Sequence, residues 1–112
     1  MEKYETGYKV VRKRSLVSAV IEGRDKSLQY KINEWTKPVK GFGPLCVFDT
    51  IEDAEIFNYH MLDSIYECLY EESKKDAIYY INSWKNIIKK GLEFLPRGTV
   101  LATKVKLLRR VR

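Results

Sequence analysis

The sequence has few of the side chains from which common enzyme active sites are built. Histidine occurs once, at His60, and the two cysteines, Cys46 and Cys68, do not form a C-x-x-C pair. No nucleophile elbow, zinc-protease motif or glycine-rich phosphate loop is present. These absences exclude the familiar zinc, redox and nucleotide-binding motifs. The sequence therefore predicts no catalytic residue, no metal site and no cofactor, and it favours a protein that is not an enzyme.

Long hydrophobic segments are also missing. No apolar run approaches the roughly 20 residues that a membrane-spanning helix requires. Residues 1–7 are polar and lack the apolar core of a secretory signal. We therefore expect a single domain over residues 1–112 that is soluble, cytoplasmic and without a membrane partner. In a reducing cytosol Cys46 and Cys68 are expected to be buried thiols, the alternative being a disulfide if their strands are neighbours.

Glutamine is scarce too, with a single residue, Gln29, whereas lysine and glutamate are abundant. Such a composition is typical of proteins from high-temperature organisms. In a chain this short, the composition fits both a thermophilic and a mesophilic source organism.

What the chain does contain is a readable strand-then-helix segment. Residues 45–48 are continuously apolar, which is typical of a strand that is covered on both faces. Thr50 follows at the position of a helix N-cap, with Asp53 in the place of the capping-box glutamate. This pattern predicts a helix over residues 51–60.

The rest of the chain indicates β-rich runs around a second helix. Isoleucines at helical spacing predict that helix over residues 77–90, capped by Asp76 and ended by Gly91. Residues 64–70 favour a strand, although their period also fits a helix. The remaining expected strands are residues 8–12, 16–21, 28–32 and 99–108. The expected fold class is therefore α+β, with a mostly antiparallel, mixed sheet of five to six strands and two helices.

Charge is distributed unevenly along the sequence. The net charge is +6, yet residues 49–72 hold eight carboxylates and no Lys or Arg, and residues 85–112 hold nine Lys or Arg and one Glu. If the basic N-terminal and C-terminal strands are neighbours, they form one basic surface for a polyanion. The residues of this expected surface are Lys9, Arg12, Lys13, Arg14, Lys104, Lys106, Arg109, Arg110 and Arg112. Its expected partner is nucleic acid or an acidic protein.

The same charges are compatible with two alternatives to a polyanion surface. The acidic helix could bind a basic strand of a second copy, which would make a homodimer or larger homo-oligomer that salt loosens. Lysines at alternate positions, such as Lys104 and Lys106, are also what an exposed edge strand uses against aggregation. The eight tyrosines are enough to supply stacking platforms for bases. However, no RRM signature, KH loop or zinc-finger spacing accompanies them.

Several segments resemble an uncharacterised family of small α+β proteins from archaea, bacteria and their viruses. The resemblance lies in residues 8–11, in Ser18, Tyr30 and Trp35, and in residues 44–54 and 95–102, with residues 78–90 as an insertion. It implies a small α+β domain, compatible with a viral or mobile-element origin, and no particular activity.

Residues 47–54 are also similar to the strand-then-helix element of small ADP-ribosyltransferase-like folds. This similarity implies an NAD-binding enzyme, or a remnant of one, in which Tyr8 or Tyr30 helps to hold NAD. No matching glutamate or second histidine is present. The leading hypothesis is therefore a non-enzymatic binding or assembly protein with a basic face, and the transferase-like enzyme and the homo-oligomer are the alternatives.

Overall fold

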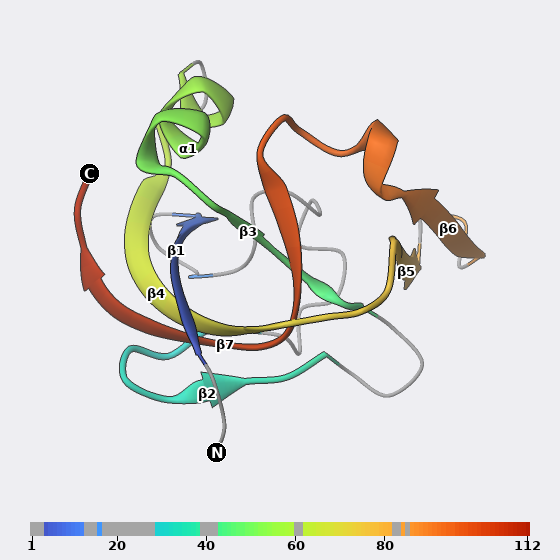
Figure 1. Ribbon diagram of the computed structural model, residues 1–112, viewed down its shortest axis with the longest axis horizontal. Helices are drawn as coiled ribbons and strands as arrows, with labels where there is room; N and C mark the ends of the chain where they lie inside the picture. Colours follow the sequence, from blue (N-terminus) through green and yellow to red (C-terminus); the bar gives the residue numbers. More distant parts are fainter. Residues whose placement is uncertain are drawn as a thin grey trace.

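The computed structural model describes residues 4–12, 16, 29–38, 43–59, 62–81, 84 and 86–112. Within these residues the chain is α+β, and the pairings between its strands are antiparallel. The elements, shown in Figure 1, are β1 (Glu5–Val11), β2 (Trp35–Thr36), β3 (Leu45–Phe48), α1 (Ile51–Asn58), β4 (Ser64–Glu72), β5 (Ala77–Ile81), β6 (Ile87–Gly91), the 3-10 helix η1 (Leu92–Phe94) and β7 (Thr99–Arg110).

Four of the strands close into a barrel because the long strand β7 pairs with both ends of a three-stranded sheet. β1 lies between β3 and β4, and β7 pairs with β3 through residues 99–102 and with β4 through residues 102–110. The short strand β2 adds to β7 at Val105 and Lys106. β7 curves around the barrel in Figure 1 and closes it, while the contact between β1 and β3 is limited to the pair Tyr8 and Phe48.

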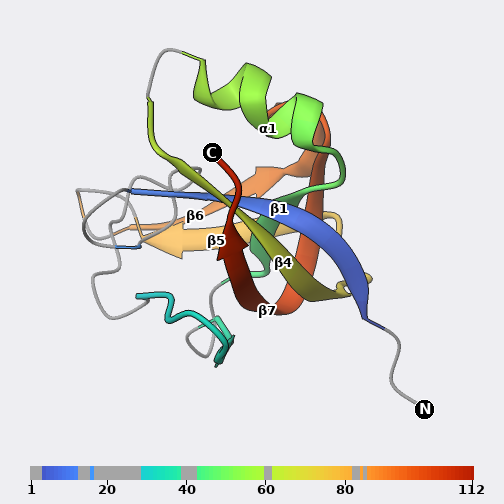
Figure 2. The ribbon, with the colours of Figure 1, turned by 90° about the vertical axis from the view of Figure 1, so that its left-hand side faces the viewer.

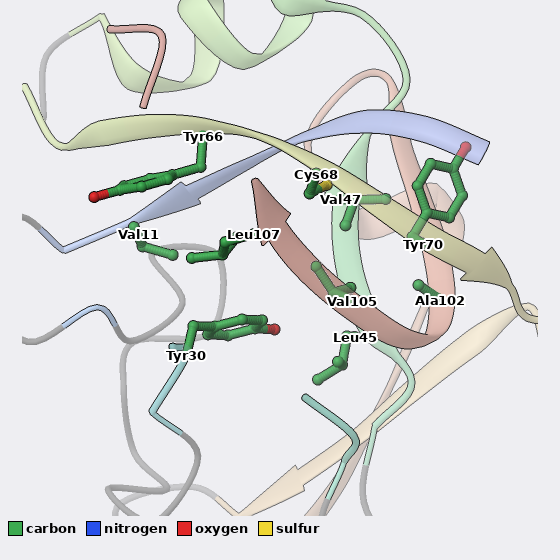
Figure 3. Packing of buried hydrophobic residues seen from close by; sticks show 10 residues of the cluster. All are labelled: Val11, Tyr30, Leu45, Val47, Tyr66, Cys68, Tyr70, Ala102, Val105 and Leu107. Atoms are coloured by element: carbon green, nitrogen blue, oxygen red, sulfur yellow. The ribbon is translucent and has the colours of Figure 1, made fainter. Parts of the chain in front are cut away.

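The main hydrophobic core comes from all four barrel strands. Val105 and Leu107 of β7 are fully buried, and Lys106 between them faces outward, as the alternation of side chains along a strand requires. Figure 3 shows this cluster closed by the ring of Tyr30, which precedes β2. Its members are Val11, Tyr30, Leu45, Val47, Tyr66, Cys68, Tyr70, Ala102, Val105 and Leu107.

The helix α1 covers a second, smaller cluster, and Figure 2 shows it lying across one end of the barrel. Ala54 is fully buried against Val10, Phe48 and Ile65, and the helix residue Phe57 packs on the same cluster. The rings of Phe48 and Phe57 are 5.3 Å apart between centroids. Neighbouring residues of β1 thus serve two clusters, since Val10 faces the helix and Val11 the barrel interior.

The predicted capped helix is confirmed. The Thr50 hydroxyl accepts a hydrogen bond from the Asp53 amide at 3.2 Å and donates one to the Asp53 carboxylate, also at 3.2 Å. The Asp53 carboxylate therefore accepts a hydrogen bond from the Thr50 hydroxyl. In a complete capping box it would accept one from the Thr50 backbone amide. The helix ends at Asn58, whose side chain bonds the backbone of Asp63.

The predicted second helix, residues 77–90, is wrong. The structure has a β-hairpin there, in which β5 pairs with β6 from Ala77 opposite Gly91 to Ile81 opposite Ile87. β5 contains two Ile and two Tyr, and β6 begins with two Ile, residue types that favour strands. Contacts from distant parts of the chain add to this preference, because Ile78 is buried and the backbone of Tyr79 exchanges hydrogen bonds with Gly43.

Other predicted elements have mixed outcomes. Residues 64–72 form the strand β4, and the final predicted strand is confirmed as β7. Residues 28–32 show isolated bridges at Gln29 and Ile32 in their described part in place of a strand. The predicted strand 16–21 lies outside the described residues except for Leu16. No helix in the described part of the chain is long and apolar enough to cross a membrane.

Candidate functional site

Lys9, the first residue of the expected basic surface, lies inside the protein. Its side chain is 1% exposed, and its Nζ donates a hydrogen bond to the carbonyl oxygen of Cys46. The same Nζ lies 5.3 Å from the centroid of the Tyr30 ring. Burial lowers the pKa of Lys9 to about 8, against the opposing effect of Cys46 and Cys68. Lys9 therefore has no place on an accessible basic surface in this structure.

Three arginines of the expected surface are paired with carboxylates. The partners come from the acidic segment of the sequence, so part of the basic charge is neutralised by the chain itself. Exposed pairs of this kind contribute about 0–1 kcal/mol each, but they lower the local positive potential. The pairs are Arg12 with Asp63 at 3.5 Å, Arg109 with Glu67 at 3.4 Å, and Arg112 with Glu55 at 3.0 Å.

Of the remaining residues, Lys13 and Arg14 lie outside the described part of the chain. Arg110 is exposed, and its Nε donates to the carbonyl oxygen of Arg112 at 2.9 Å. Lys104 and Lys106 are half-buried on β7. The described residues of the expected surface therefore do not act as one uniform basic face, and the two lysines of β7 are distinguished by what surrounds them.

Lys104 and Lys106 lie against two aromatic rings, those of Tyr4 and Trp35. The ring centroids of Tyr4 and Trp35 are 4.8 Å apart, with the planes inclined by 44°. The Nζ of Lys104 is 4.7 Å from the Trp35 centroid and 5.1 Å from the Tyr4 centroid. The Nζ of Lys106 is 5.8 Å from the Trp35 centroid. We call these four residues the aromatic–lysine cluster.

The strand pairing explains why the cluster forms. Trp35 of β2 is paired with Lys106 of β7, which places the indole on the outer side of the barrel beside the lysine. Since successive residues of a strand alternate between its faces, Lys104 joins Lys106 on that side, while Val105 and Leu107 enter the core. The Nζ of Lys104 also donates to the Tyr4 hydroxyl at 3.3 Å, across 100 positions of sequence.

The charges that border the cluster are mostly positive along β2. Lys31 and Lys37 are exposed on either side of this strand in the sequence, together with Glu34. On the other side of β7, Glu71 is opposite Lys104, and its carboxylate accepts a hydrogen bond from the hydroxyl of Thr103 at 2.5 Å. An ammonium over an aromatic face is attracted by about 0.5–1 kcal/mol at an exposed site. The cluster thus combines two positive charges with two half-buried aromatic rings.

The surroundings of Lys9 are the second unusual site, but they are closed to ligands. Tyr30 is 1% exposed, its hydroxyl has no hydrogen-bond partner among the described residues, and burial raises its pKa well above the ordinary value. Perturbed groups of this kind often mark functional sites. A catalytic group must reach a substrate, and neither Lys9 nor Tyr30 does so in this conformation.

The cysteines are both free and buried, so the expected thiols are present and the alternative disulfide is not. Burial raises the pKa of both thiols, that of Cys68 to about 12. Cys46 packs with Ile78 and Leu101 beside the hairpin, whereas Cys68 belongs to the barrel core. A thiol that stays protonated is a weak nucleophile, so neither residue is suited to covalent catalysis.

The described part of the chain contains no group of three or more His, Cys, Asp or Glu that could hold a metal ion. His60 lies outside it. Tyr8, considered above as a contact for NAD, is half-buried and packs on the cluster beneath α1. A shallow hollow of about 120 Å³ lies beside β7, well below the ~300 Å³ at which ligand pockets begin. Its lining residues are Pro38, Pro44, Ser73, Lys75 and Thr103.

The chain matches no family model, no curated protein and no solved structure. Both family resemblances described above stay predictions, and the function has to be argued from the geometry of this chain. Tyr4 and Trp35 are the site residues that the sequence did not reveal. Trp35 lies in a segment bounded by Gly and Pro that predicts a loop, and nothing local indicates that β7 lies beside it.

Proposed function

We propose that this protein binds single-stranded nucleic acid through the aromatic–lysine cluster. The observation that carries the proposal is the Trp35 ring, partly exposed on the barrel and flanked by the ammonium groups of Lys104 and Lys106. A base stacked on an exposed aromatic ring gains about 1–3 kcal/mol, and any base can do so. Lysines beside the ring supply contacts to the phosphates that join such bases.

Two features favour a single strand over a duplex. Aromatic stacking requires unpaired bases, since those of a duplex are stacked on each other. The one α-helix among the described residues, α1, is also poorly suited to the major groove. Its exposed residues include Glu52 and Ile56, and Glu55 is held by Arg112. A negatively charged helix would be repelled by the backbone of DNA.

The proposal predicts a shallow dependence of affinity on salt. The positive charges near the cluster are Lys31, Lys37, Lys104 and Lys106, which allow two to four phosphate contacts. For single strands each contact adds about −0.7 to the slope of log affinity against log salt, so the slope should lie between about −1.5 and −3. The nine-residue surface expected from the sequence would give a steeper slope, of about −6.

Fluorescence anisotropy with labelled single-stranded DNA and RNA tests this function. Trp35→Ala should weaken binding by about 10-fold or more, and Trp35→Phe should restore most of it, because one stacked base carries about 1–3 kcal/mol. Lys104→Ala with Lys106→Ala should weaken binding and flatten the salt slope. The matched control is Lys74→Ala with Lys75→Ala, which removes the same charge from an exposed segment outside the cluster.

A tryptophan readout makes the test specific. The chain has two tryptophans, so a Trp84→Phe background leaves Trp35 as the sole indole, and a stacked base should quench its fluorescence. Binding with unchanged indole emission would contradict stacking at this site. Absence of any affinity for single strands at low salt would overturn the proposal. If the protein bound an acidic protein and no nucleic acid, Lys104 and Lys106 would be contacts for that protein partner instead.

A further inference from the structure

One group of large apolar side chains is exposed on and just after α1. Ile56, Tyr59 and Leu62 are 64%, 73% and 69% exposed, and we call them the helix patch. Ile56 and Tyr59 follow the exposed Glu52 by one and two helical turns, whereas Ala54 on the other side faces the core. The helix therefore has two apolar sides, of which the fold covers one.

A second group of this kind lies on the β5–β6 hairpin and on the 3-10 helix that follows it. Trp84, Ile87 and Phe94 are 81%, 67% and 70% exposed, and Leu92 is 39% exposed. We call these four residues the hairpin patch. In the described part of the chain, β6 pairs with β5 on one side and with no strand on the other. Exposed apolar side chains beside an open strand are typical of an interaction site.

The charges beside the two patches are of opposite sign. Glu52 and Asp49 are exposed next to the helix patch. Lys89 is exposed and shares the outer face of β6 with Ile87, and Lys90 is half-buried. The nearby carboxylates, Glu93 and Asp76, lie at the Gly91 end of the hairpin, where the Leu92 amide donates to the carbonyl oxygen of Asp76. Figure 1 shows α1 and the hairpin on separate parts of the molecule, so the two patches cannot cover each other within one chain.

We propose that the helix patch of one copy binds the hairpin patch of a second copy. Contact between like patches is disfavoured by charge. Two helix patches would bring their Glu52 carboxylates together, and antiparallel pairing of two β6 strands about their centre would place Lys89 opposite the partner's Lys89. Contact between unlike patches covers apolar area on both sides and matches a carboxylate with an ammonium.

This arrangement differs from the homo-oligomer expected from the sequence, in which the acidic helix binds a basic strand and residues 77–90 are a helix. On β7, Lys104 and Lys106 lie on aromatic rings, and Arg109 is paired with Glu67. The hairpin supplies exposed apolar side chains as well as charge. Because the two patches lie on separate parts of the molecule, each copy can contact two different neighbours. In that head-to-tail arrangement association continues into a ring or an open chain, whereas a reciprocal two-fold dimer would use both patches of both copies.

Two variants that block one patch each test the arrangement. Ile56→Lys places a cation in the helix patch, and Ile87→Glu places an anion in the hairpin patch; both sites are mainly exposed, so the fold should tolerate them. In sedimentation velocity between about 10 μM and 1 mM, the wild-type protein should grow in mass with concentration. Each variant alone should stay monomeric. Ile32→Glu, at an exposed site outside both patches, is the control and should assemble like the wild type.

Mixing the two blocked variants gives the decisive result. Ile56→Lys retains its hairpin patch and Ile87→Glu retains its helix patch, so the mixture should form a 1:1 dimer and nothing larger. Raising the salt concentration should weaken this dimer by screening the Glu52 and Lys89 charges. A wild-type protein that stays monomeric throughout would overturn the proposal. So would variants that remain monomeric when mixed, since an intact helix patch would then fail to bind an intact hairpin patch. Dimerisation of either variant alone would instead indicate contact between like patches.

Discussion

A lysine ammonium in the barrel interior costs folding free energy at neutral pH. The pKa of Lys9 is about 8 in the folded protein and 10.5 when the side chain is free in solution. Between these values the unfolded chain binds more protons than the folded one, so stability rises with pH across this window. Below pH 8 the cost is fully present and constant, at about 3 kcal/mol for a shift of this size.

Replacing Lys9 with methionine should therefore stabilise the protein. Lys9→Met keeps an apolar stem and removes the buried charge, at the loss of the hydrogen bond to Cys46, so we expect a gain of about 1–3 kcal/mol at pH 7. The gain should shrink as pH rises from 8 to 10.5. Urea unfolding of both proteins across this range measures it.

Other groups titrate in the same pH range. Burial raises the pKa of Cys46, Cys68 and Tyr70, so their contribution to stability is present below the ordinary pKa and is lost at higher pH. Tyr70 cancels in the difference between the two curves, whereas the Lys9 charge lowers the pKa of Cys46 and Cys68, so the difference reports Lys9 together with its coupling to these thiols. A difference that does not change between pH 7 and 10.5 would show that the folded protein does not suppress the charge of Lys9.

At the scale of single elements, α1 depends on a cap that can be tested with two substitutions. Thr50→Ala removes the acceptor of the Asp53 amide and should cost about 1 kcal/mol of unfolding free energy. Thr50→Ser keeps the hydroxyl and should cost much less. Denaturant unfolding compares the two variants. Equal losses would mean that the Thr50 methyl group, and not the hydrogen bond, stabilises this end of the helix.

The same elements show which parts of the fold could be predicted from the sequence. The cap of α1 is local, with Thr50 and Asp53 three positions apart, so the pattern is readable without knowledge of the rest of the chain. The hairpin is not local in this sense. Ile78 and Ile81 fit a helical period, but Ile78 is buried against Cys46 and Leu101 and the backbone of Tyr79 bonds Gly43. These distant contacts decide between strand and helix.

The candidate site could be predicted only in part, for a related reason. Lys104 and Lys106 could be recognised from charge and spacing along a strand. The ring of Trp35 beside them could not, because it depends on the pairing of β2 with β7. The burial of Lys9 depends likewise on barrel closure. A count of charges in the sequence treats every cation as equivalent. In the structure Lys9 is buried in the core, and Arg12, Arg109 and Arg112 are paired with carboxylates.

For the whole molecule, stability should depend on the core side chains of β7. Leu107 is fully buried and lies opposite Cys68 of β4, so Leu107→Ala should cost about 2–5 kcal/mol. Leu108, its neighbour in the same strand, is half-buried, and Leu108→Ala should cost clearly less. Thermal or urea unfolding compares them. Similar losses at the two positions would contradict the placement of the core on one side of β7.

Barrel closure also has a consequence for the time the chain needs to fold. β1 spans residues 5–11, yet the strand that completes its barrel, β7, spans residues 99–110. The chain must lose most of its loop-closure entropy before these distant strands pair and stabilise the barrel. Such high contact order is typical of domains that fold in milliseconds to seconds. During synthesis on the ribosome, β1, β3 and β4 are complete well before β7 has emerged. Until then the growing chain has unpaired strand edges, and it depends on β7 to close them.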